Sequence, residues 1–221
     1  MSNSLIQILV LAGIAIFLIL KLRSVLGTRD GFEKPQERVS PPQPDARRGK
    51  FEVIDGGPDR DINDHVPEGS PSAQALAAMK QAEPSFSVSE FLRGARGAYE
   101  MILMAFERGD LEEVKPFLAE DVFDAFSEVV AARKARGLTV ESEFGGIREL
   151  TLQEAEFDRA TREGEITIRF ASELTSAARD AEGTVVEGSK TELRRQRDVW
   201  TFARKMGAND PNWQLVATES A

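Results

Sequence analysis

At 221 residues the chain is long enough for one domain of ordinary size with additional segments. Its net charge of -9 and isoelectric point near 4.9 argue against nucleic acid as a main partner, because phosphate binding needs clustered positive charge. The chain has no Cys, and its single His, His65, lies in a Gly/Pro/Asp-rich segment, which excludes Ser-His, Cys-His and His-ligated zinc chemistry from any folded region. We expect no cofactor and no metal.

An apolar run begins after the first four residues. Residues 5–20 read LIQILVLAGIAIFLIL, in which only Gln7 and Gly13 depart from strong hydrophobicity. Counted on through Leu26, the run has about 22 residues and would extend about 33 Å as a helix, which matches a hydrocarbon core of about 30 Å. We therefore predict a transmembrane anchor over residues 1–26.

A cleaved secretory signal peptide is the alternative interpretation of this run. No basic residue precedes the run and no A-x-A-like cleavage site follows it, so the anchor fits better. Lys21, Arg23, Arg29 and Lys34 all follow the run, and the positive-inside rule then leaves the rest of the chain in the cytoplasm. The prediction is a single-pass protein of a bacterial cell inner membrane, N-terminus outside, with Lys21, Arg23 and Arg29 as candidate contacts to the membrane surface.

Residues 27–84 are rich in Pro, Gly, Asp, Arg and Ser and poor in large apolar side chains. Such a segment cannot bury enough surface to offset the entropy of ordering it. We predict a flexible linker with a reach on the order of 40 Å. Within it, KFEVI (residues 50–54) is either a short docking motif or ordinary linker variation, and ALAAMKQAE (residues 75–83) has a weak helical pattern.

From residue 85 to residue 221 the composition becomes that of a folded domain. Ser87, followed by Glu90 three residues later, matches a capping box, and apolar residues then recur at helical spacing until Gly109. A short helix in DLEEVKPFL and a longer one in EDVFDAFSEVVAARKA, closed by Gly137, are expected to follow. These patterns predict a helical first half of the domain.

After Gly137 the hydrophobic period changes to two. LTVESEF, RELTLQEAEFD, EITIRFASELTSA, TELRRQRDVWTFARK and NWQLVATE have the β-branched and aromatic residues typical of strands. Turns are expected at Gly145-Gly146, Glu163-Gly164, Glu182-Gly183 and Asp210-Pro211. Helices followed by strands indicate an α+β domain, a curved antiparallel sheet with helices packed on one face.

Large aromatic side chains suggest an apolar pocket between the helices and the inner face of the sheet. The alternative is that they form an ordinary core. The candidates for binding a ligand or a partner are Phe91, Tyr99, Phe106, Phe126, Trp200 and Phe202.

Asp198 shares a strand face with Trp200 and Phe202 if alternation holds. Since it stands among Arg194, Arg195 and Arg197, we expect an exposed, ion-paired carboxylate. The alternative is a carboxylate that faces an apolar cavity with a raised pKa and acts as a general base.

Arg93 and Arg96 fall on the polar side of the long helix. Together with an N-terminal anchor they are candidates for contact with anionic lipid. Glu90 and Glu100 dilute this positive charge, and a solvated helix face is the alternative interpretation.

Three stretches resemble a known family: the span ending in LRSVLGTRDGFE, the helical SEFLRGARGAYEMILMAFERGDLEEVKPFLAEDVFDAF, and the tail RDVWTFARKMGANDPNWQLVATES. In this order they resemble the Tim44-like family, named for the mitochondrial import inner-membrane translocase subunit, and specifically its membrane-anchored alphaproteobacterial members. The resemblance covers the anchor and residues 85–221. It implies a cystatin-like or nuclear-transport-factor-two-like α+β domain with a large apolar pocket.

The resemblance also implies a function. Mitochondrial members bind cardiolipin-rich membrane and tether a heat-shock chaperone to the translocation channel, whereas this chain has a built-in anchor and lacks their long chaperone-binding region. We therefore expect a non-enzymatic, membrane-anchored adaptor with no catalytic residues. Its expected partners are proteins, with translocation or chaperone components as candidates, and lipid at the cytoplasmic membrane face.

Two other functions are compatible with the sequence. One is a small-molecule-binding or isomerase/dehydratase-like site in the apolar pocket, with Asp198 as the acid or base and Tyr99 as a hydrogen-bond donor, because this fold class hosts such enzymes. The other is a scaffold for envelope organisation, which differs from the adaptor only in its partners.

Overall fold

The computed structural model describes residues 59–220. Two short helical elements come first, α2 (Arg60–Asn63) and α3 (Pro71–Ala82), and are followed by the long α4 (Val88–Arg108), the single 3-10 turn η1 (Lys115–Phe117) and α5 (Glu120–Ala135). Four strands follow within the described residues: β1 (Thr139–Asp158), β2 (Glu163–Arg179), β3 (Val185–Lys205) and β4 (Gln214–Ser220). The order of helices and then strands agrees with the α+β class expected from the sequence.

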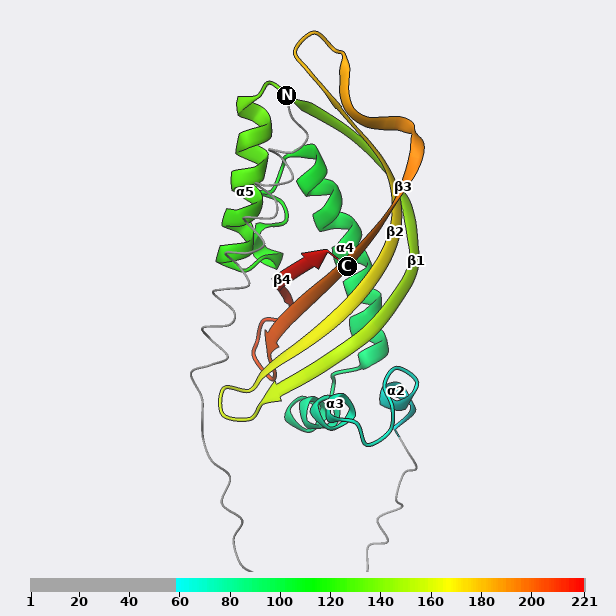
Figure 1. Cartoon of the computed structure of the whole chain (residues 1–221). Coiled ribbons are helices and arrows are strands. Elements are labelled where there is room, and N and C mark those ends of the chain that lie inside the picture. The colour runs from blue at the N-terminus through cyan, green and yellow to red at the C-terminus, as the bar shows by residue number, and fades with distance from the viewer. Residues whose placement is uncertain (1–58, 221) are drawn as a thin grey trace, which may run out of the picture. The chain divides into compact units, whose positions relative to one another are not determined.

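The four strands form one antiparallel sheet in the order β1-β2-β3-β4. The sheet is curved, with α4 and α5 on the same side of it and α2 and α3 at one end (Figure 1). Alternate side chains of β2, such as Ile166, Ile168 and Phe170, are fully buried beneath the helices. The core therefore lies between the inner face of the sheet and α4, as the period-two pattern predicts.

The ends of α4 follow the expected capping chemistry. The Ser87 hydroxyl accepts a hydrogen bond from the main-chain N–H of Glu90 at 3.3 Å. Gly109 ends the helix in the left-handed conformation, with a φ of 73°. The sequence prediction of this helix is confirmed at both ends.

The expected turn at Gly145-Gly146 is wrong. The two glycines lie inside β1, where the pairing register with β2 shifts between Phe144 and Gly146 and again between Ile147 and Glu149. A Cβ on Gly145 would lie 3.0 Å from the main-chain oxygen of Glu173, which is a tighter contact than most side chains make, so the bulge favours glycine here. The glycines bend one long strand and do not separate two.

The linker predicted for residues 27–84 is corrected in its second part. Residues from Arg60 onward form α2 and α3, and Leu76 and Met79 of α3 have no exposed surface. Met79 packs against β2, where its methyl carbon would lie 3.0 Å from a Cβ on Gly164. A few large apolar residues at helical spacing were enough to dock this segment, and the average composition concealed them. The first part of the predicted linker lies outside the described residues.

The predicted transmembrane anchor also lies outside the described residues. Among residues 59–220, no helix combines the length and the apolar character that crossing a membrane requires.

The outer face of the sheet is polar. Arg148 and Arg195 both pair with Glu173, at 2.8 and 3.2 Å, and Arg169 pairs with Glu149. Such cross-strand ion pairs are typical of a sheet face in contact with water. Apolar binding sites must therefore be sought on the helix side or at the ends of the sheet.

Candidate functional site

An open hollow lies between the N-terminal half of α4 and the β3–β4 connection. Its volume is about 360 Å³. The helix contributes Phe91, Gly94, Ala95 and Ala98, and β3 contributes Phe202 and Arg204. Glu90 of α4 also lines it, and the remaining lining residues come from the segment before α4, from η1 and from the β3–β4 connection: Glu83, Ser85, Phe86, Ser87, Phe117, Pro211, Asn212 and Trp213. We call this hollow the aromatic groove.

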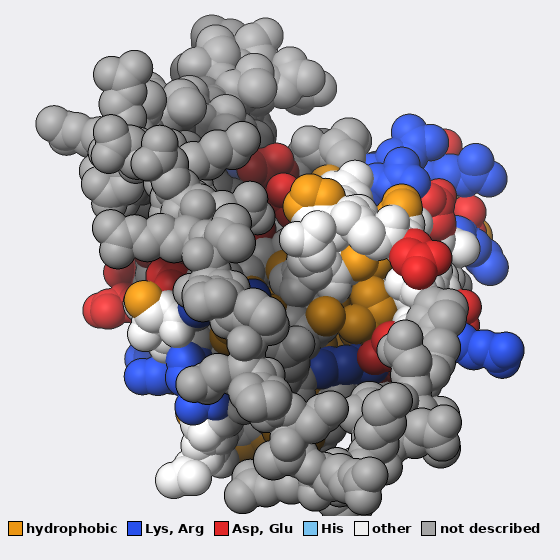
Figure 2. Space-filling model, turned by 90° about the horizontal axis from the view of Figure 1, so that it is seen from below, with side chains coloured by type: hydrophobic (Ala, Val, Ile, Leu, Met, Phe, Trp, Pro, Cys, Tyr) orange, Lys and Arg blue, Asp and Glu red, His pale blue; other side chains and the backbone are white. Residues whose placement is uncertain are grey.

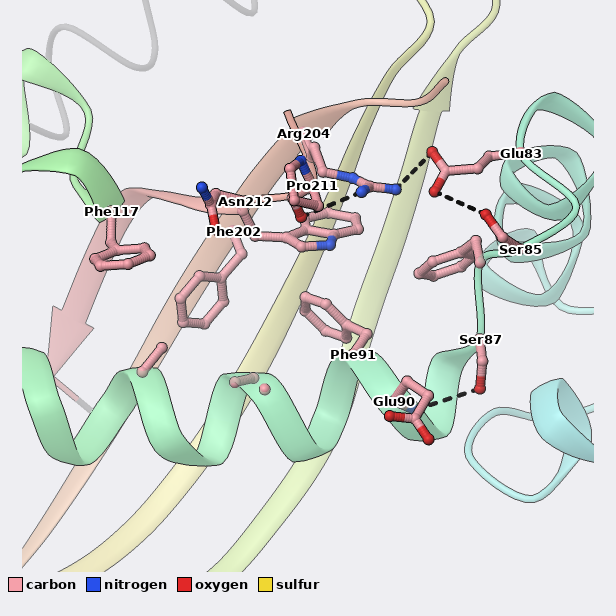
Figure 3. A pocket seen from close by; sticks show the side chains of 15 residues that line it. Glu83, Ser85, Ser87, Glu90, Phe91, Phe117, Phe202, Arg204, Pro211 and Asn212 are labelled. Atoms are coloured by element: carbon pink, nitrogen blue, oxygen red, sulfur yellow. Dashed lines mark hydrogen bonds and ion pairs between the residues drawn. The ribbon is translucent and has the colours of Figure 1, made fainter. Parts of the chain in front are cut away.

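The rings in the aromatic groove contact one another. Phe91 packs edge-on against Phe202 at a centroid distance of 6.1 Å and lies 4.6 Å from Trp213. Phe86 also contacts Trp213, with ring centroids 5.9 Å apart. Figure 3 shows Phe91 and Phe202 between the helix and the strand, with Phe117 at one end of the row. Aromatic rings of this kind provide a firm apolar surface with little loss of side-chain entropy on binding.

A charged pair closes one end of the aromatic groove. Arg204 contacts Glu83 at 2.6 Å, donates to the main-chain oxygen of Pro211 and lies over the ring of Trp213 at 5.3 Å (Figure 3). Burial raises the pKa of Glu83, but the hydrogen bonds from Arg204 and from the N–H of Gly207 outweigh this effect and lower it. The pair is therefore charged at neutral pH and nearly neutral in sum.

The Nε atom of Arg204 is buried and has no hydrogen-bond acceptor within residues 59–220. The other guanidinium nitrogens of this side chain are occupied by Glu83 and Pro211. A buried donor without a partner is unfavourable, so this end of the aromatic groove contains an unsatisfied hydrogen-bond donor.

The structure separates the six predicted pocket residues. All four of Phe91, Tyr99, Trp200 and Phe202 are buried, but only Phe91 and Phe202 also line the aromatic groove. Phe106 and Phe126 join α4 to α5, with ring centroids 4.8 Å apart, and line neither this groove nor the second hollow described below. Two of the six thus share one open site and the others pack the domain.

Tyr99 and Asp198 form the centre of a buried polar cluster. The Tyr99 hydroxyl donates to Oδ2 of Asp198 at 2.5 Å, and lies 2.8 Å from the Ser172 hydroxyl. The Tyr99 hydroxyl has one proton, and it uses this proton in the hydrogen bond to Asp198. The hydroxyl of Ser172 is therefore the donor in its hydrogen bond with Tyr99. The Gln196 amide donates to the same carboxylate at 2.9 Å. These contacts fasten α4 to β2 and β3.

The expectation of an exposed, ion-paired Asp198 is wrong. Its neighbours Arg195 and Arg197 lie on the outer face, because residues alternate across β3, whereas Asp198 is only 6% exposed. Burial raises the pKa of Asp198 and outweighs the hydrogen bonds from Tyr99 and Gln196, and burial likewise raises the pKa of Tyr99. Neither residue lines the aromatic groove, so the general-base hypothesis lacks a path for substrate there.

A second buried carboxylate was not anticipated. Glu107 of α4 accepts hydrogen bonds from the hydroxyls of Ser142 on β1, at 2.5 Å, and Ser176 on β2, at 2.7 Å. Like the Tyr99 cluster, this group joins α4 to the sheet. Its two hydrogen bonds hold the C-terminal end of α4 against β1 and β2.

The candidate membrane-surface residues differ in what the structure says of them. Arg93 and Arg96 are exposed on α4, and Arg93 pairs with Glu90 at 3.0 Å. The pairing leaves this part of the helix with little net positive charge. Lys21, Arg23 and Arg29 lie outside the described residues.

A second hollow, of about 470 Å³, lies beside the β1–β2 hairpin. Pro71 and Ala75 of α3 and Phe157 of β1 form its apolar part, and its acidic residues are Glu156, Asp158, Glu163 and Glu165. Within the described range, no three His, Cys, Asp or Glu side chains are placed so as to hold a metal ion. Figure 2 shows one end of the molecule, where hydrophobic side chains are visible in a hollowed area between basic and acidic ones.

The sequence patterns missed Glu83, Arg204 and Trp213. Glu83 lay in the predicted linker, and Arg204 and Trp213 stand on either side of a loop that had no distinguishing motif. The available signal was Trp213, two residues after the turn-forming Pro211. Trp is highly buried on average, so a Trp in a loop is expected to pack against another part of the domain.

Comparison with known proteins supports the family resemblance. The model of the Tim44-like domain family matches residues 72–220 of this chain, well over half of its length. The chain belongs to the Tim44-like family. The match begins within α3, so this helix is part of the Tim44-like domain, whereas α2 lies before the matched residues.

The Tim44-like domain is also similar to a curated plant protein. The mitochondrial import inner membrane translocase subunit TIM44-1 of Arabidopsis thaliana is 20% identical over 144 residues, which span 65% of this chain and 30% of the plant protein. The intermembrane space region of the chloroplast protein ARC6 matches 58% of this chain and 95% of its own, with 10% identity and a TM-score of 0.41. The second likeness is too distant to support an inference.

Proposed function

We propose that this chain is a non-enzymatic adaptor in protein translocation or membrane-protein assembly. In this proposal residues 1–26 hold it in a bacterial inner membrane, residues 27–58 are the linker, and the Tim44-like domain works at the cytoplasmic face. Family membership and the name of the plant relative support a role in translocation. Because the identity to that relative is low and only part of its length is matched, the kind of partner is inferred from the site.

The observation that carries the proposal is the aromatic groove. It combines contacting rings from three parts of the chain, Phe91, Phe202 and Trp213, with a charged pair that is already neutralised. Such a surface favours apolar or aromatic side chains over charged groups. We propose that it binds an apolar segment of a partner protein.

The openness of the aromatic groove favours a protein segment over a small molecule. Small-molecule sites bury about 70–90% of the ligand surface, and a drug-sized ligand in this hollow of about 360 Å³ would keep one side in water. A protein segment can place one or two side chains in the groove and continue across the surface. Confinement to a membrane raises the effective concentration of partners there, so weak contacts of this kind suffice.

The lipid contact in the proposal is assigned to the anchor. Each basic residue near an anionic surface contributes about 1 kcal/mol, and Arg93 is already paired with Glu90. Lys21, Arg23 and Arg29 adjoin the predicted span in the sequence and have the better position for this role. The domain itself is left to bind protein.

The aromatic groove can be blocked without disturbing the fold. A Cβ on Gly94 meets no atom within 4 Å, although this residue lines the groove, so Gly94→Leu fills the groove and raises helix propensity. A photo-crosslinking amino acid at the exposed Asn212 would be placed in the full chain in its own membrane. We expect Gly94→Leu to lower crosslinking to the partner about tenfold, as for loss of a central contact.

Gly97→Leu is the matched control. Gly97 is on the same helix and also has open space around its Cβ position, but it does not line the aromatic groove. Crosslinking from Asn212 should persist in this variant and should be absent from a probe at Thr151, which is exposed on the sheet. Equal crosslinking in the Gly94 and Gly97 variants would sink the proposal.

A further inference from the structure

One exposed side of α5 has an unusual pattern of charge. In Figure 1 the sheet and α4 lie on one side of α5. Val122 and Val130 are the buried residues of this helix. The side next to these valines exposes a stripe that starts and ends with charges of opposite sign. Its members are Asp121, Ala125, Val129, Ala132 and Arg136, which we call the α5 stripe.

The α5 stripe is one continuous helix face. At 100° per residue its five positions fall within an arc of about 80°, and its charged ends are about 22 Å apart at 1.5 Å per residue. Val129 is 41% exposed, which makes it one of the few large apolar side chains open to water in the described chain. The guanidinium of Arg136 has no ion pair within residues 59–220.

The order of residues in the α5 stripe is self-complementary. Asp121 and Arg136 lie at equal distances from the midpoint between residues 128 and 129, and so do Ala125 and Ala132. When a second copy of the helix is laid antiparallel on the first, each Asp121 faces an Arg136 and each Ala125 faces an Ala132. This is the arrangement that a two-fold symmetric interface requires.

We infer that the α5 stripe is a dimer interface that binds a second copy of this chain, with the two α5 helices antiparallel. The alanines allow the helix axes to approach to about 8 Å, and the two Val129 side chains meet beside the dyad. Two Asp121–Arg136 ion pairs close the ends and fix the direction, since a parallel pair would place like charges together.

This interface is small. A single helix face buries less than the roughly 1,200 Å² of standard protein interfaces, so the dimer is weak in solution. Glu128 lies at the rim, where water screens its carboxylate from that of the second copy. Confinement to a membrane, as in the proposed function, supplies the local concentration at which such a dimer forms. The contacts themselves do not depend on the aromatic groove.

The absence of Cys from the chain permits a direct test. Val129→Cys would be introduced into the full chain, reconstituted in lipid vesicles and oxidised, and covalent dimers would be followed on non-reducing gels. Ala131→Cys is the matched control, because Ala131 is exposed on the same helix but about 160° away from Val129 around the helix axis. We expect the Val129→Cys variant to form dimers at least about tenfold faster than the Ala131→Cys variant.

Two further measurements fix the orientation and the charges. In an antiparallel pair, Ala125→Cys chains should crosslink to Ala132→Cys chains in a mixture more readily than either variant crosslinks to itself. In the Val129→Cys background, Asp121→Arg or Arg136→Asp alone should slow crosslinking about tenfold, and the two together should restore it, because both ion pairs change sign at once.

Three results would overturn the inference. They are equal crosslinking at positions 129 and 131, crosslinking of the Val129→Cys variant only to other proteins, and charge reversals that leave the rate unchanged. Because Val129→Cys is a small change at an exposed position, the first result decides even if a charge reversal weakens the helix. Loss of the aromatic groove by Gly94→Leu should leave all these crosslinks intact, which separates this inference from the proposed function.

Discussion

Asp198 is a carboxyl group enclosed between a helix and a sheet. Its contacts are the hydroxyl of Tyr99 from α4, the amide of Gln196 from β3, and the charge of Arg194 on the same strand, while Ser172 of β2 binds Tyr99. Burial raises the pKa of Asp198 above the value of about 3.9 found in unfolded chains. The folded protein therefore holds this proton more tightly than the unfolded chain does.

This difference in proton affinity predicts a pH dependence of stability. The contribution of Asp198 is greatest below about pH 4 and is lost as the pH rises through the raised pKa. Asp198→Asn keeps the shape and an acceptor for Tyr99 but has no proton to lose. We expect the melting temperature of the variant minus that of the original protein, both measured in the full chain, to increase between pH 4 and pH 7. A difference that does not change with pH would contradict this assignment.

At the scale of single residues, the sequence predicted which face of the sheet a side chain occupies better than it predicted which groups surround that side chain. Alternation correctly placed Asp198 on the face of Trp200 and Phe202. It could not show that Tyr99, almost one hundred positions earlier in the chain, would cover the carboxylate, because that contact depends on how α4 lies across the sheet. The nearby arginines suggested ion pairing, although two of them point to the other face.

The short helix α2 acts on the much longer α4. The Asp61 carboxylate accepts hydrogen bonds from the N–H groups of Val88 and Ser89, at 2.8 and 2.9 Å, and pairs with Lys80 at 2.8 Å. Burial raises the pKa of Asp61, but the hydrogen bonds from Lys80, Ser89 and Val88 outweigh it and lower the pKa strongly. One side chain thus caps a helix that begins 27 residues later.

Removal of this cap should weaken the whole domain. We expect Asp61→Ala to lower the free energy of unfolding by about 1–2 kcal/mol, the usual cost of a lost helix cap. The effect should shrink as the pH falls below about 4, because a carboxyl with a lowered pKa stabilises the fold only while it is ionised. Denaturant titration of the full chain in detergent at two pH values measures both effects.

Asp59→Ala is the matched control for this prediction. Asp59 also pairs with Lys80, at 2.8 Å, but it bonds the N–H of Asp61 and does not reach α4. A loss in Asp59→Ala as large as in Asp61→Ala would show that the ion pair, and not the cap, supplies the stability.

Element prediction succeeded where the signals were local. Ser87 and Gly109 define α4 within a few residues of its ends, and Gly137 follows α5 closely. It failed at Gly145-Gly146 because a turn and a bulge both favour glycine, and only the partner strand distinguishes them. The helical pattern of residues 75–83 was recognised, but α3 was assigned to the linker because the pattern is short and has neighbours typical of linkers.

At the scale of the whole molecule, α3 completes the core. Leu76 is fully buried, and Ser72 accepts a hydrogen bond from the N–H of Ala155 on β1 at 3.1 Å. Leu76→Ala should lower the free energy of unfolding by about 2–5 kcal/mol, as for other buried leucines. A flexible linker would show no such effect, so the measurement tests the corrected boundary of the domain.

Gln81→Ala is the control for the same helix, because Gln81 is exposed. It should change stability by no more than about 0.5 kcal/mol. If both variants lost equally little free energy of unfolding, α3 would have to be assigned to the linker.

The aromatic groove could not have been predicted from the sequence as a unit. Phe91 and Phe202 were among the candidates because they are aromatic and periodic, but the groove also needs Glu83 and Trp213. These residues meet only after α3, α4 and the β3–β4 connection have packed together. Patterns along the chain describe elements, and a site built where several elements end has no pattern of its own.

The antiparallel pairing of β4 with β3 also determines when the domain can fold. Leu215 bridges to Leu118, and its oxygen accepts from the N–H of Ala119 at 3.0 Å, so the start of α5 is fastened to the final strand. During synthesis the apolar faces of α3, α4 and α5 emerge before every strand they will cover. Until residues 214–220 arrive, those faces remain exposed to water and to chaperones, and the nascent chain is at its most vulnerable to misassembly.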